Sequence, residues 1–140
     1  MSTVEVDALR GATHALDGAS EDLVEQIREL TGGGAPHAFD TTGVPRVIRN
    51  AVKALTAQGS LVFVGLGAGE TGIDTMDLIG AGKSVRGSIE GDANPQDLIP
   101  LLLDWQAQGR FPAERMISAF PFEDIDEAVA RMREDVVKRL

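Results

Sequence analysis

The amino-acid sequence predicts an α/β fold with a mostly parallel sheet. Strand-like and helix-like segments follow one another in the order strand, helix, strand, helix, strand, short helix, strand, helix, helix. Such alternation implies right-handed crossovers between parallel strands. Residues 61–64 are apolar throughout, which is typical of a parallel strand covered on both faces. Glycines at positions 65, 67, 69 and 72 follow this central strand, at the end where open α/β sheets bind ligands.

Size and composition limit the functions that the chain can have. Its 140 residues suffice for one domain with an adequate core. Acidic residues number 22 against 13 basic ones, the formal net charge is −9, and there is no run of Lys or Arg. This balance argues against nucleic acid or an anionic membrane surface as a partner. The sequence has no cysteine and no long apolar run, so we expect a soluble cytoplasmic protein without disulfides, thiolate zinc site or membrane span.

The first part of the chain contains two strand-like segments and a helix. Residues 3–7 alternate in polarity, and residues 13–17 form a second strand-like run that ends in a polar turn. A helix is predicted over residues 20–31, with Ser20 as its cap and acidic residues in its first turn. Three glycines end it. Its apolar stripe consists of Leu23, Val24, Ile27 and Leu30.

A strand, a helix and the central strand follow. Residues 37–42 are predicted as a strand that ends at Gly43. Pro45 suits the first position of a helix over residues 45–57, because its missing N–H costs nothing there. Gly59 is expected to end this helix and to open the central strand. The inward face of the helix consists of Val47, Ile48, Ala51, Val52 and Leu55.

The segments after the glycines are a short helix up to residue 82, a strand over residues 84–90 and two further helices. Asn94 caps a helix over residues 95–108, and Gly109 ends it. After a bend at residues 120–122, the last helix covers residues 123–133, with acidic residues first and basic residues last. The apolar stripe of the helix over 95–108 consists of Leu98, Ile99, Leu102 and Trp105.

The glycine cluster has two interpretations on pattern alone. Gly67-Ala-Gly69-Glu-Thr-Gly72 matches the dinucleotide-binding pattern G-x-G-x-x-G, follows a strand, and has Glu90 at a distance that suits a ribose contact. A true fingerprint opens a sturdy helix whose N-terminus holds the pyrophosphate, whereas the helix expected here is short and rich in glycine. A glycine-rich surface turn without a ligand is the alternative.

Four motifs occur together in an order and spacing typical of one family. They are Gly11-Ala-Thr-His-Ala-Leu-Asp17, Phe39-Asp-Thr-Thr-Gly43, Gly59-Ser-Leu-Val-Phe-Val-Gly65 and Phe120-Pro-Phe-Glu-Asp-Ile-Asp-Glu-Ala128. In this register the chain resembles the C-terminal half of the cofactor domain of zinc-type medium-chain alcohol dehydrogenases, most closely their aryl- (benzyl-) alcohol dehydrogenase branch. The resemblance covers nearly the whole chain from Gly11 onward. It implies a partial Rossmann-like, doubly wound sheet with flanking helices.

The resemblance also implies that residues 1–140 form only part of a dinucleotide-binding domain. The sequence shows no counterpart of the family's catalytic zinc domain, nor of its first βαβ unit with the family's own G-x-G-x-x-G. Glu5-Val-Asp7 can be interpreted as a remnant of the strand that binds the adenosine ribose.

The same resemblance implies which residues contact an NAD cofactor. The family contacts the cofactor after the strand at 37–42, and its main-chain groups lie beside the nicotinamide at the end of the central strand. Further main-chain contacts come from the strand at 84–90, and a basic residue near the C-terminus reaches the pyrophosphate. Carried over, the cofactor-binding residues are Thr42, Gly43, Val64, Gly65, Leu66, Ser88, Glu90 and Lys138. Glu90 is an acid where the family is often apolar.

Other residues with suggestive chemistry have structural explanations. His14 and His37 lie on predicted strands without a neighbouring ligand set, so this chain is expected to bind no zinc. The acids at 123–127 suit a solvated helix start, and Trp105 belongs to a core stripe. Lys138 suits a surface charge as well as a phosphate contact. No catalytic residue is predicted.

Three functions follow from these observations. The chain is a fragment of an NAD-dependent alcohol dehydrogenase, inactive alone because hydride transfer needs the zinc that polarises the alcohol oxygen; or it is a weak nucleotide-binding module; or it is a non-catalytic domain that forms dimers. A homodimer would form through the edge strand between Ser84 and Glu90, since an unpaired edge invites strand addition. If the family's first strands are absent, residues 13–17 are expected to pair directly with residues 39–42, with residues 4–7 filling in, or two chains exchange segments.

Overall fold

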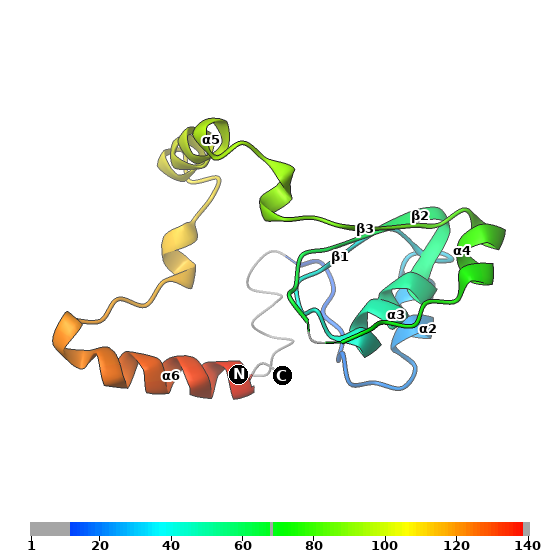
Figure 1. Ribbon diagram of the computed structural model, residues 1–140, viewed down its shortest axis with the longest axis horizontal. Helices are drawn as coiled ribbons and strands as arrows, with labels where there is room; N and C mark the ends of the chain where they lie inside the picture. Colours follow the sequence, from blue (N-terminus) through cyan, green and yellow to red (C-terminus); the bar gives the residue numbers. More distant parts are fainter. Residues whose placement is uncertain (1–11, 68, 139–140) are drawn as a thin grey trace. The chain divides into compact units, whose positions relative to one another are not determined.

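The computed structural model describes residues 12–67 and 69–138, and the chain divides into two compact units, Met1–Asp92 and Ala93–Leu140. The first unit contains a parallel sheet of three strands (Figure 1), which are β1 (Ala35–Asp40), β2 (Leu55–Phe63) and β3 (Ser84–Gly87). Their order is β1-β2-β3, with β2 in the middle. The predicted α/β class and the mostly parallel sheet are confirmed.

The first described helix, α2 (Leu23–Leu30), begins later than predicted. Its N-cap residue is Asp22 rather than the predicted Ser20, and the Asp22 side chain accepts no hydrogen bond from a backbone N–H. Its Oδ1 instead accepts hydrogen bonds from the hydroxyl of Ser20 and, at 2.7 Å, from the side-chain amide of Gln26. These bonds hold the pKa of Asp22 below its usual value of 3.8, and the bond from Ser20 has the largest effect. Gly32, with φ of 68°, ends the helix as the glycine triplet predicted.

The second helix, α3 (Pro45–Ala54), is shorter than predicted. At Leu55 the backbone becomes extended (φ −67°, ψ 144°), and this residue opens β2 instead of continuing the helix. The pairing of β2 with β1 shifts its register between Ala35 and His37. In the same stretch of β2, Gln58 has φ of 59°, as in a bulge that accommodates extra residues. The predicted helix end at residue 57 and the predicted opening of the strand at Gly59 are therefore wrong.

Helices cover one face of the sheet in the first unit. The helix α3 packs on β1 and β2, α2 packs on α3, and α4 (Thr75–Ala81) packs on β2. Between them lies a small core in which Leu61 has no exposed surface. On the opposite face of the sheet, Phe39 is 67% exposed, so the cover expected on both faces is found on one face among the described residues of this unit. The buried apolar side chains of this core are Ile48, Val52, Leu55 and Leu61.

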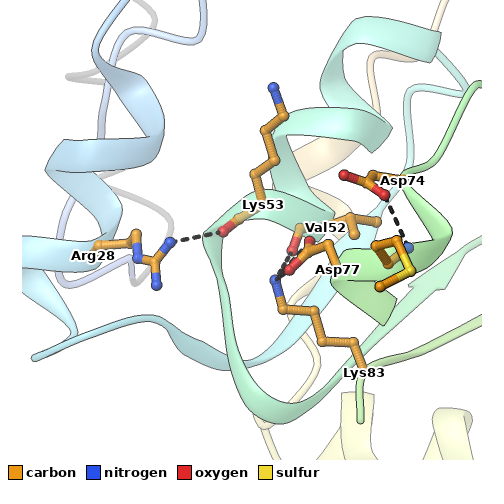
Figure 2. A network of polar contacts seen from close by, with 7 residues as sticks. Arg28, Val52, Lys53, Asp74, Asp77 and Lys83 are labelled. Carbon is orange, nitrogen blue, oxygen red and sulfur yellow. Dashed lines mark hydrogen bonds and ion pairs between the residues drawn. The ribbon is translucent and has the colours of Figure 1, made fainter. Parts of the chain in front are cut away.

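The last turn of α3 is joined to its neighbours by two basic side chains (Figure 2). Lys83, which follows α4, donates through Nζ to the main-chain oxygen of Val52 at 3.0 Å and to the Asp77 carboxylate at 2.8 Å. Arg28 of α2 donates to the main-chain oxygen of Lys53 at 3.5 Å. Cations suit this position because the helix dipole is negative at its C-terminus. The Lys83 side chain is only 4% exposed, which strengthens its interactions.

Residues 13–17 form no strand, so their prediction as a strand is wrong. Among the described strands, β1 pairs with β2 alone, and the predicted pairing of 13–17 with 39–42 is therefore also wrong. The end of this segment already belongs to the turn before α2, because Asp17 accepts a hydrogen bond from the N–H of Ala19 at 2.9 Å and another from that of Ser20 at 3.1 Å. The predicted strand at residues 3–7 lies outside the described residues.

The second unit consists of two α-helices joined by short 3-10 turns. These are α5 (Pro95–Ala107), η2 (Ala113–Met116), η3 (Phe122–Asp124) and α6 (Ile125–Lys138). Asn94 caps α5 as predicted, accepting the N–H of Gln96 at 3.2 Å. No side chain described in this unit is buried, and Ile99 of the predicted stripe is 55% exposed. Neither these helices nor those described in the first unit are long and apolar enough to cross a membrane.

Candidate functional site at the carboxyl end of the sheet

Three loops leave the first unit's sheet at the same edge, the carboxyl end of its strands. The final residues of the strands are in register, because Asp40 pairs with Phe63 and Phe63 pairs with Gly87. The loops that follow contain the predicted contact residues of this unit, which are Thr42 and Gly43 after β1, Val64, Gly65 and Leu66 after β2, and Ser88 and Glu90 after β3. Residues that lie far apart in the sequence thus share the edge at which such sheets bind ligands.

The loops after β1 and β2 touch through glycine backbones. A Cβ atom added to Gly65 would lie 2.3 Å from the nitrogen of Gly43, and one added to Gly67 would lie 1.8 Å from the oxygen of Gly43. No side chain fits at such distances, so glycine is required by space here. We call Gly43, Gly65 and Gly67 the glycine contact. The sequence identified the glycines after β2, and the structure adds that Gly43 is what they meet, whereas Gly69 and Gly72 face open space.

A buried aspartate bonds both loops, one through its carboxylate and the other through its main-chain oxygen. Asp40, the last residue of β1, is 3% exposed. Its Oδ1 accepts hydrogen bonds from the hydroxyl of Thr42 at 2.7 Å and its N–H at 3.2 Å, and its Oδ2 accepts the N–H of Gly43 at 2.9 Å. Its main-chain oxygen accepts the N–H groups of Val64 at 2.9 Å and Gly65 at 3.4 Å. Asp40 was not among the predicted site residues, although an Asp that ends a strand before Thr-Thr-Gly is a pattern typical of an Asx turn.

The loop after β3 begins earlier than predicted. The strand ends at Gly87, although the N–H of Ser88 still donates to the main-chain oxygen of Phe63 at 3.1 Å. Glu90 and Asp92 then have φ of 51° and 54°, in the left-handed region. Residues with side chains rarely adopt this region, and with Gly91 (φ 73°) between them three successive residues adopt it, which turns the chain out of the sheet. The predicted strand end at Glu90 is therefore wrong, and Glu90 lies in an exposed turn.

A surface ion pair closes this turn. Arg86 Nη2 lies 2.8 Å from Asp92 Oδ2, and the Ser88 hydroxyl lies 3.3 Å from the same oxygen. The side chains of Arg86 and Asp92 are 64% and 55% exposed, so water and salt screen their attraction. The pair orders the turn without adding much stability.

The N–H groups at this edge are largely engaged within the protein. Those of Thr42 and Gly43 donate to the carboxylate of Asp40, those of Val64 and Gly65 to its main-chain oxygen, and that of Ser88 to Phe63. Five of the seven predicted contact residues at this edge therefore have N–H groups that already donate within the protein. Leu66 adds an apolar side chain that is fully exposed. An exposed apolar side chain beside these polar loops suits a ligand with an apolar part.

The remaining predicted contact residue, Lys138, belongs to the second unit. Lys138 is the last residue of α6, and its side chain lies outside the described residues, so its phosphate contact stays a prediction. His37 Nδ1 lies 2.9 Å from the Ser60 hydroxyl, and His14 lies beside Thr13. In the described ranges, no group of three or more His, Asp or Glu side chains is placed to hold a metal ion.

Comparison with known proteins identifies a family over most of the chain. A family model described as zinc-binding dehydrogenase matches residues 6–107. The geraniol dehydrogenase of Castellaniella defragrans is 43% identical over 122 residues, which cover 85% of this chain and 33% of that protein. The chain thus spans about a third of the length of the curated relatives it matches.

Two solved structures share the fold closely. An alcohol dehydrogenase zinc-binding domain protein from Burkholderia ambifaria has a TM-score of 0.88 and 36% identity, covering 95% of this chain and 36% of that one. Benzyl alcohol dehydrogenase from Acinetobacter calcoaceticus has a TM-score of 0.88 and 32% identity, covering 94% of this chain and 37% of that one. The family resemblance expected from the four motifs, and the partial Rossmann-like sheet that it implied, are confirmed.

Proposed function

This chain belongs to the zinc-binding dehydrogenase family, and we propose that it is the nicotinamide-binding part of an NAD-dependent alcohol dehydrogenase. Members of the family are NAD(P)-dependent alcohol dehydrogenases, oxidoreductases that transfer hydride between an alcohol and the cofactor. On this proposal the chain corresponds to the second part of their cofactor domain, without the first βαβ unit and the catalytic zinc domain. A cytoplasmic location belongs to the same proposal.

The observation that carries the proposal is the glycine contact. The family's main-chain contacts to the nicotinamide correspond to Val64, Gly65 and Leu66, in the loop that crosses Gly43. Because glycine lets these two loops touch, two sets of residues that the family resemblance assigns to the cofactor are brought together at one edge of the sheet.

The engaged N–H groups support a carboxamide as the ligand group. A nicotinamide carboxamide can donate two N–H bonds to carbonyl oxygens. Five of the predicted contact residues have N–H groups that already donate within the protein, so we expect carbonyl oxygens to be the main-chain groups that meet the ligand. A carboxylate in the same place has no N–H to donate, so its oxygens would face carbonyl oxygens without a hydrogen bond. The site should therefore prefer NAD to its analogue with a carboxylate on the pyridine ring by roughly tenfold or more.

Fluorescence titration of NADH with the purified chain tests this function, with molecular mass determined in the same buffer. We expect saturable binding, displaced by NAD and only weakly by the carboxylate analogue. A folded chain that leaves NADH fluorescence unchanged would contradict the proposal. Equal displacement by the two dinucleotides would contradict the carboxamide assignment while leaving nucleotide binding in place.

We propose that the chain alone does not oxidise alcohols. In the family a zinc ion polarises the alcohol oxygen, and zinc sites use Cys, His and carboxylate ligands. The sequence has no cysteine, and the described His, Asp and Glu residues form no such group, so the donor set does not fit a catalytic zinc. An assay with benzyl alcohol, NAD and added zinc should show no NADH formation. Turnover above the protein-free rate would contradict this part of the proposal.

The second candidate function is a dimerising module, which is favoured by the position of β3. This strand pairs with β2 on one side and with no described strand on the other. N–H groups two residues apart point the same way, and Ser88 donates toward β2, so Arg86 also faces β2 whereas Gly87 faces the free edge. A second copy of the chain could add its own β3 there.

Substitution at Gly87 tests the dimer, because the N–H of this residue faces the free edge. A proline at the neighbouring Arg86 would be a poor test, since it would remove an N–H that faces β2 and damage the sheet itself. Gly87→Pro removes an N–H on the free edge, and Gly87→Ala is the matched control that keeps it. An added Cβ there lies 3.7 Å from the Phe63 ring, an ordinary contact. Light scattering should show a dimer for Gly87→Ala and a monomer for Gly87→Pro. A monomeric parent chain, or a dimer that survives Gly87→Pro, would rule out the edge-strand dimer.

A further inference from the structure

Asp40 is placed to control the distance between two loops without facing solvent. The residue ends β1, and its side chain is 3% exposed. Its carboxylate receives three hydrogen bonds from the loop after β1, at 2.7, 2.9 and 3.2 Å, and its main-chain oxygen receives two from the loop after β2, at 2.9 and 3.4 Å. One residue thus joins both loops that meet in the glycine contact.

The chemistry of these bonds requires a carboxylate. All three groups that point at the side chain, the N–H and hydroxyl of Thr42 and the N–H of Gly43, act as donors. An ionised carboxylate offers only acceptors, and hydrogen bonds to it are about twice as strong as neutral ones. In Asp40→Asn an NH2 group at the Oδ1 position faces the N–H of Thr42 and can only donate to the Thr42 hydroxyl oxygen, so the bonds from Thr42 to the carboxylate are lost. The shape of the side chain is nearly unchanged, so the substitution tests its hydrogen bonds rather than its volume.

The glycine contact depends on this arrangement. Gly43 has φ of 65°, and its Cβ position would lie 2.4 Å from the nitrogen of Gly67. A glycine backbone is free to leave this conformation, since nothing but its surroundings holds it there. The surroundings of Gly43 on its own side are the Asp40 carboxylate and the turn that Thr42 forms by accepting the N–H of Val44 at 3.1 Å.

We propose that Asp40 is a positioning residue for the nicotinamide: it touches no ligand, but it fixes the loop at Thr42 and Gly43 against the loop at Val64 and Gly65. If the loop at Thr42 and Gly43 is loosened, the loop at Val64 and Gly65 keeps its place, but the groups of Thr42 and Gly43 no longer lie opposite it. Nucleotide affinity then falls even though every residue proposed to contact the ligand is still present. This inference rests on the proposed function for its ligand, and on the hydrogen bonds alone for the order of the loops.

The test compares Asp40→Asn with Asp74→Asn in the full chain. Asp74 is a matched control because its carboxylate also accepts a backbone N–H, that of Met76 at 2.9 Å, but it is exposed and caps α4. Two readouts are needed, NADH affinity by fluorescence and amide hydrogen exchange by NMR. For Asp40→Asn we expect NADH affinity to fall about tenfold or more, and exchange at Thr42 and Gly43 to accelerate by a similar factor. Asp74→Asn should change neither.

The exchange readout separates this inference from the proposed function. If the parent chain binds no NADH, the proposed function fails, and faster exchange confined to Thr42 and Gly43 would still support the loop-ordering role of Asp40. Unchanged exchange in Asp40→Asn, or acceleration equal to that of the core amides of Val52 and Leu61, would overturn it. Equal NADH affinity of variant and parent would overturn the link to the nucleotide.

A second pair of variants keeps the inference testable if Asp40→Asn does not fold. Thr42→Val removes the hydroxyl that donates to Asp40 and accepts from Val44, whereas Thr42→Ser keeps it. We expect intermediate acceleration of Gly43 exchange in Thr42→Val and recovery in Thr42→Ser. Identical behaviour of the two variants would contradict the role of the carboxylate bonds.

Discussion

At the carboxyl end of the sheet, two loops meet through the backbones of Gly43, Gly65 and Gly67, whereas at its amino end α3 is joined to its neighbours by the side chains of Lys83 and Arg28. At the carboxyl end, no side chain lies at the point where the two loops meet. The second has long side chains that bring positive charge to the last carbonyl oxygens of a helix. The same three strands connect the two ends, so the contrast arises from the loops.

The difference indicates which end is free to act on other molecules. Loops at the carboxyl end of parallel strands bind ligands, and here two such loops are held together by glycine backbones. At the amino end, Val52 and Asp77 already satisfy the ammonium group of Lys83. Substitutions at both ends should therefore lower stability, but only those at the carboxyl end should change nucleotide binding.

The largest effect is expected from an added methyl group at the glycine contact. Gly67→Ala places a Cβ 1.8 Å from the main-chain oxygen of Gly43, so the two loops must separate. Such overpacking should lower the free energy of unfolding by about 3 kcal/mol or more and abolish NADH binding. Denaturant unfolding followed by circular dichroism measures the first effect, and fluorescence titration measures the second.

Gly72→Ala is the matched control, because the same methyl group there meets nothing within 4 Å. It should leave affinity and stability close to those of the parent chain. A Gly67→Ala variant that behaves like Gly72→Ala would show that the loops do not touch in solution. Gly65→Val is a less specific test than Gly67→Ala with its control, because its Cβ would strike Thr41 and Gly43 before it reached any ligand.

A smaller effect, confined to stability, is expected at the amino end. Lys83→Met removes the ammonium group and leaves Asp77 without its cation, while the apolar length of the side chain stays. Asp77 is 33% exposed and can be rehydrated, so the loss should be about 1–2 kcal/mol, below that of a fully buried pair. NADH affinity should match that of the parent chain. A variant that unfolds like the parent but binds NADH less tightly would reverse the comparison between the two ends.

The sequence predicted the central part of the fold because its signals there are local. Pro45, Asn94 and Gly32 mark helix ends by their own backbone chemistry, and each acts as expected. The helix end at residue 57 was wrong, because Leu55 suits the apolar face of a helix as well as a buried strand. The strand prediction for residues 13–17 was wrong because a strand needs a neighbouring strand to pair with, and the alternation of apolar residues does not specify one.

The candidate site was only partly predictable for the same reason. The glycines after β2 are visible as a cluster, but their contact with Gly43 joins residues more than a helix apart in the chain. The sequence around Asp40 suits an Asx turn, but it does not show that the main-chain oxygen of Asp40 also accepts two hydrogen bonds from the loop after β2. Lys83 likewise looks like a surface lysine, since nothing near it in sequence indicates that its side chain is 4% exposed.

The smallest effect is expected from a side-chain hydrogen bond before α2. Arg28, in the last turn of α2, contacts the end of α3 at the amino end of the sheet, whereas Ser20 and Asp22 lie before the first turn of α2. There the Ser20 hydroxyl, followed by Gln26, holds the pKa of Asp22 below 3.8. Ser20→Ala should raise that pKa toward 3.8, as measured by NMR titration of the carboxyl carbon, whereas Ser118→Ala in the second unit should leave it unchanged.

The sign of the accompanying stability change follows from the direction of the pKa shift. A carboxylate with a lowered pKa in the folded state stabilises the fold above its usual pKa, and this contribution is lost as pH falls through the folded value. Ser20→Ala should therefore be slightly less stable than the parent chain at pH 7, and the difference should vanish below the folded pKa of Asp22. Asp22 is exposed, so this difference must stay well below that of Lys83→Met. A larger effect from Ser20 than from Lys83 would mean that exposed side-chain bonds, rather than the buried lysine, stabilise the first unit.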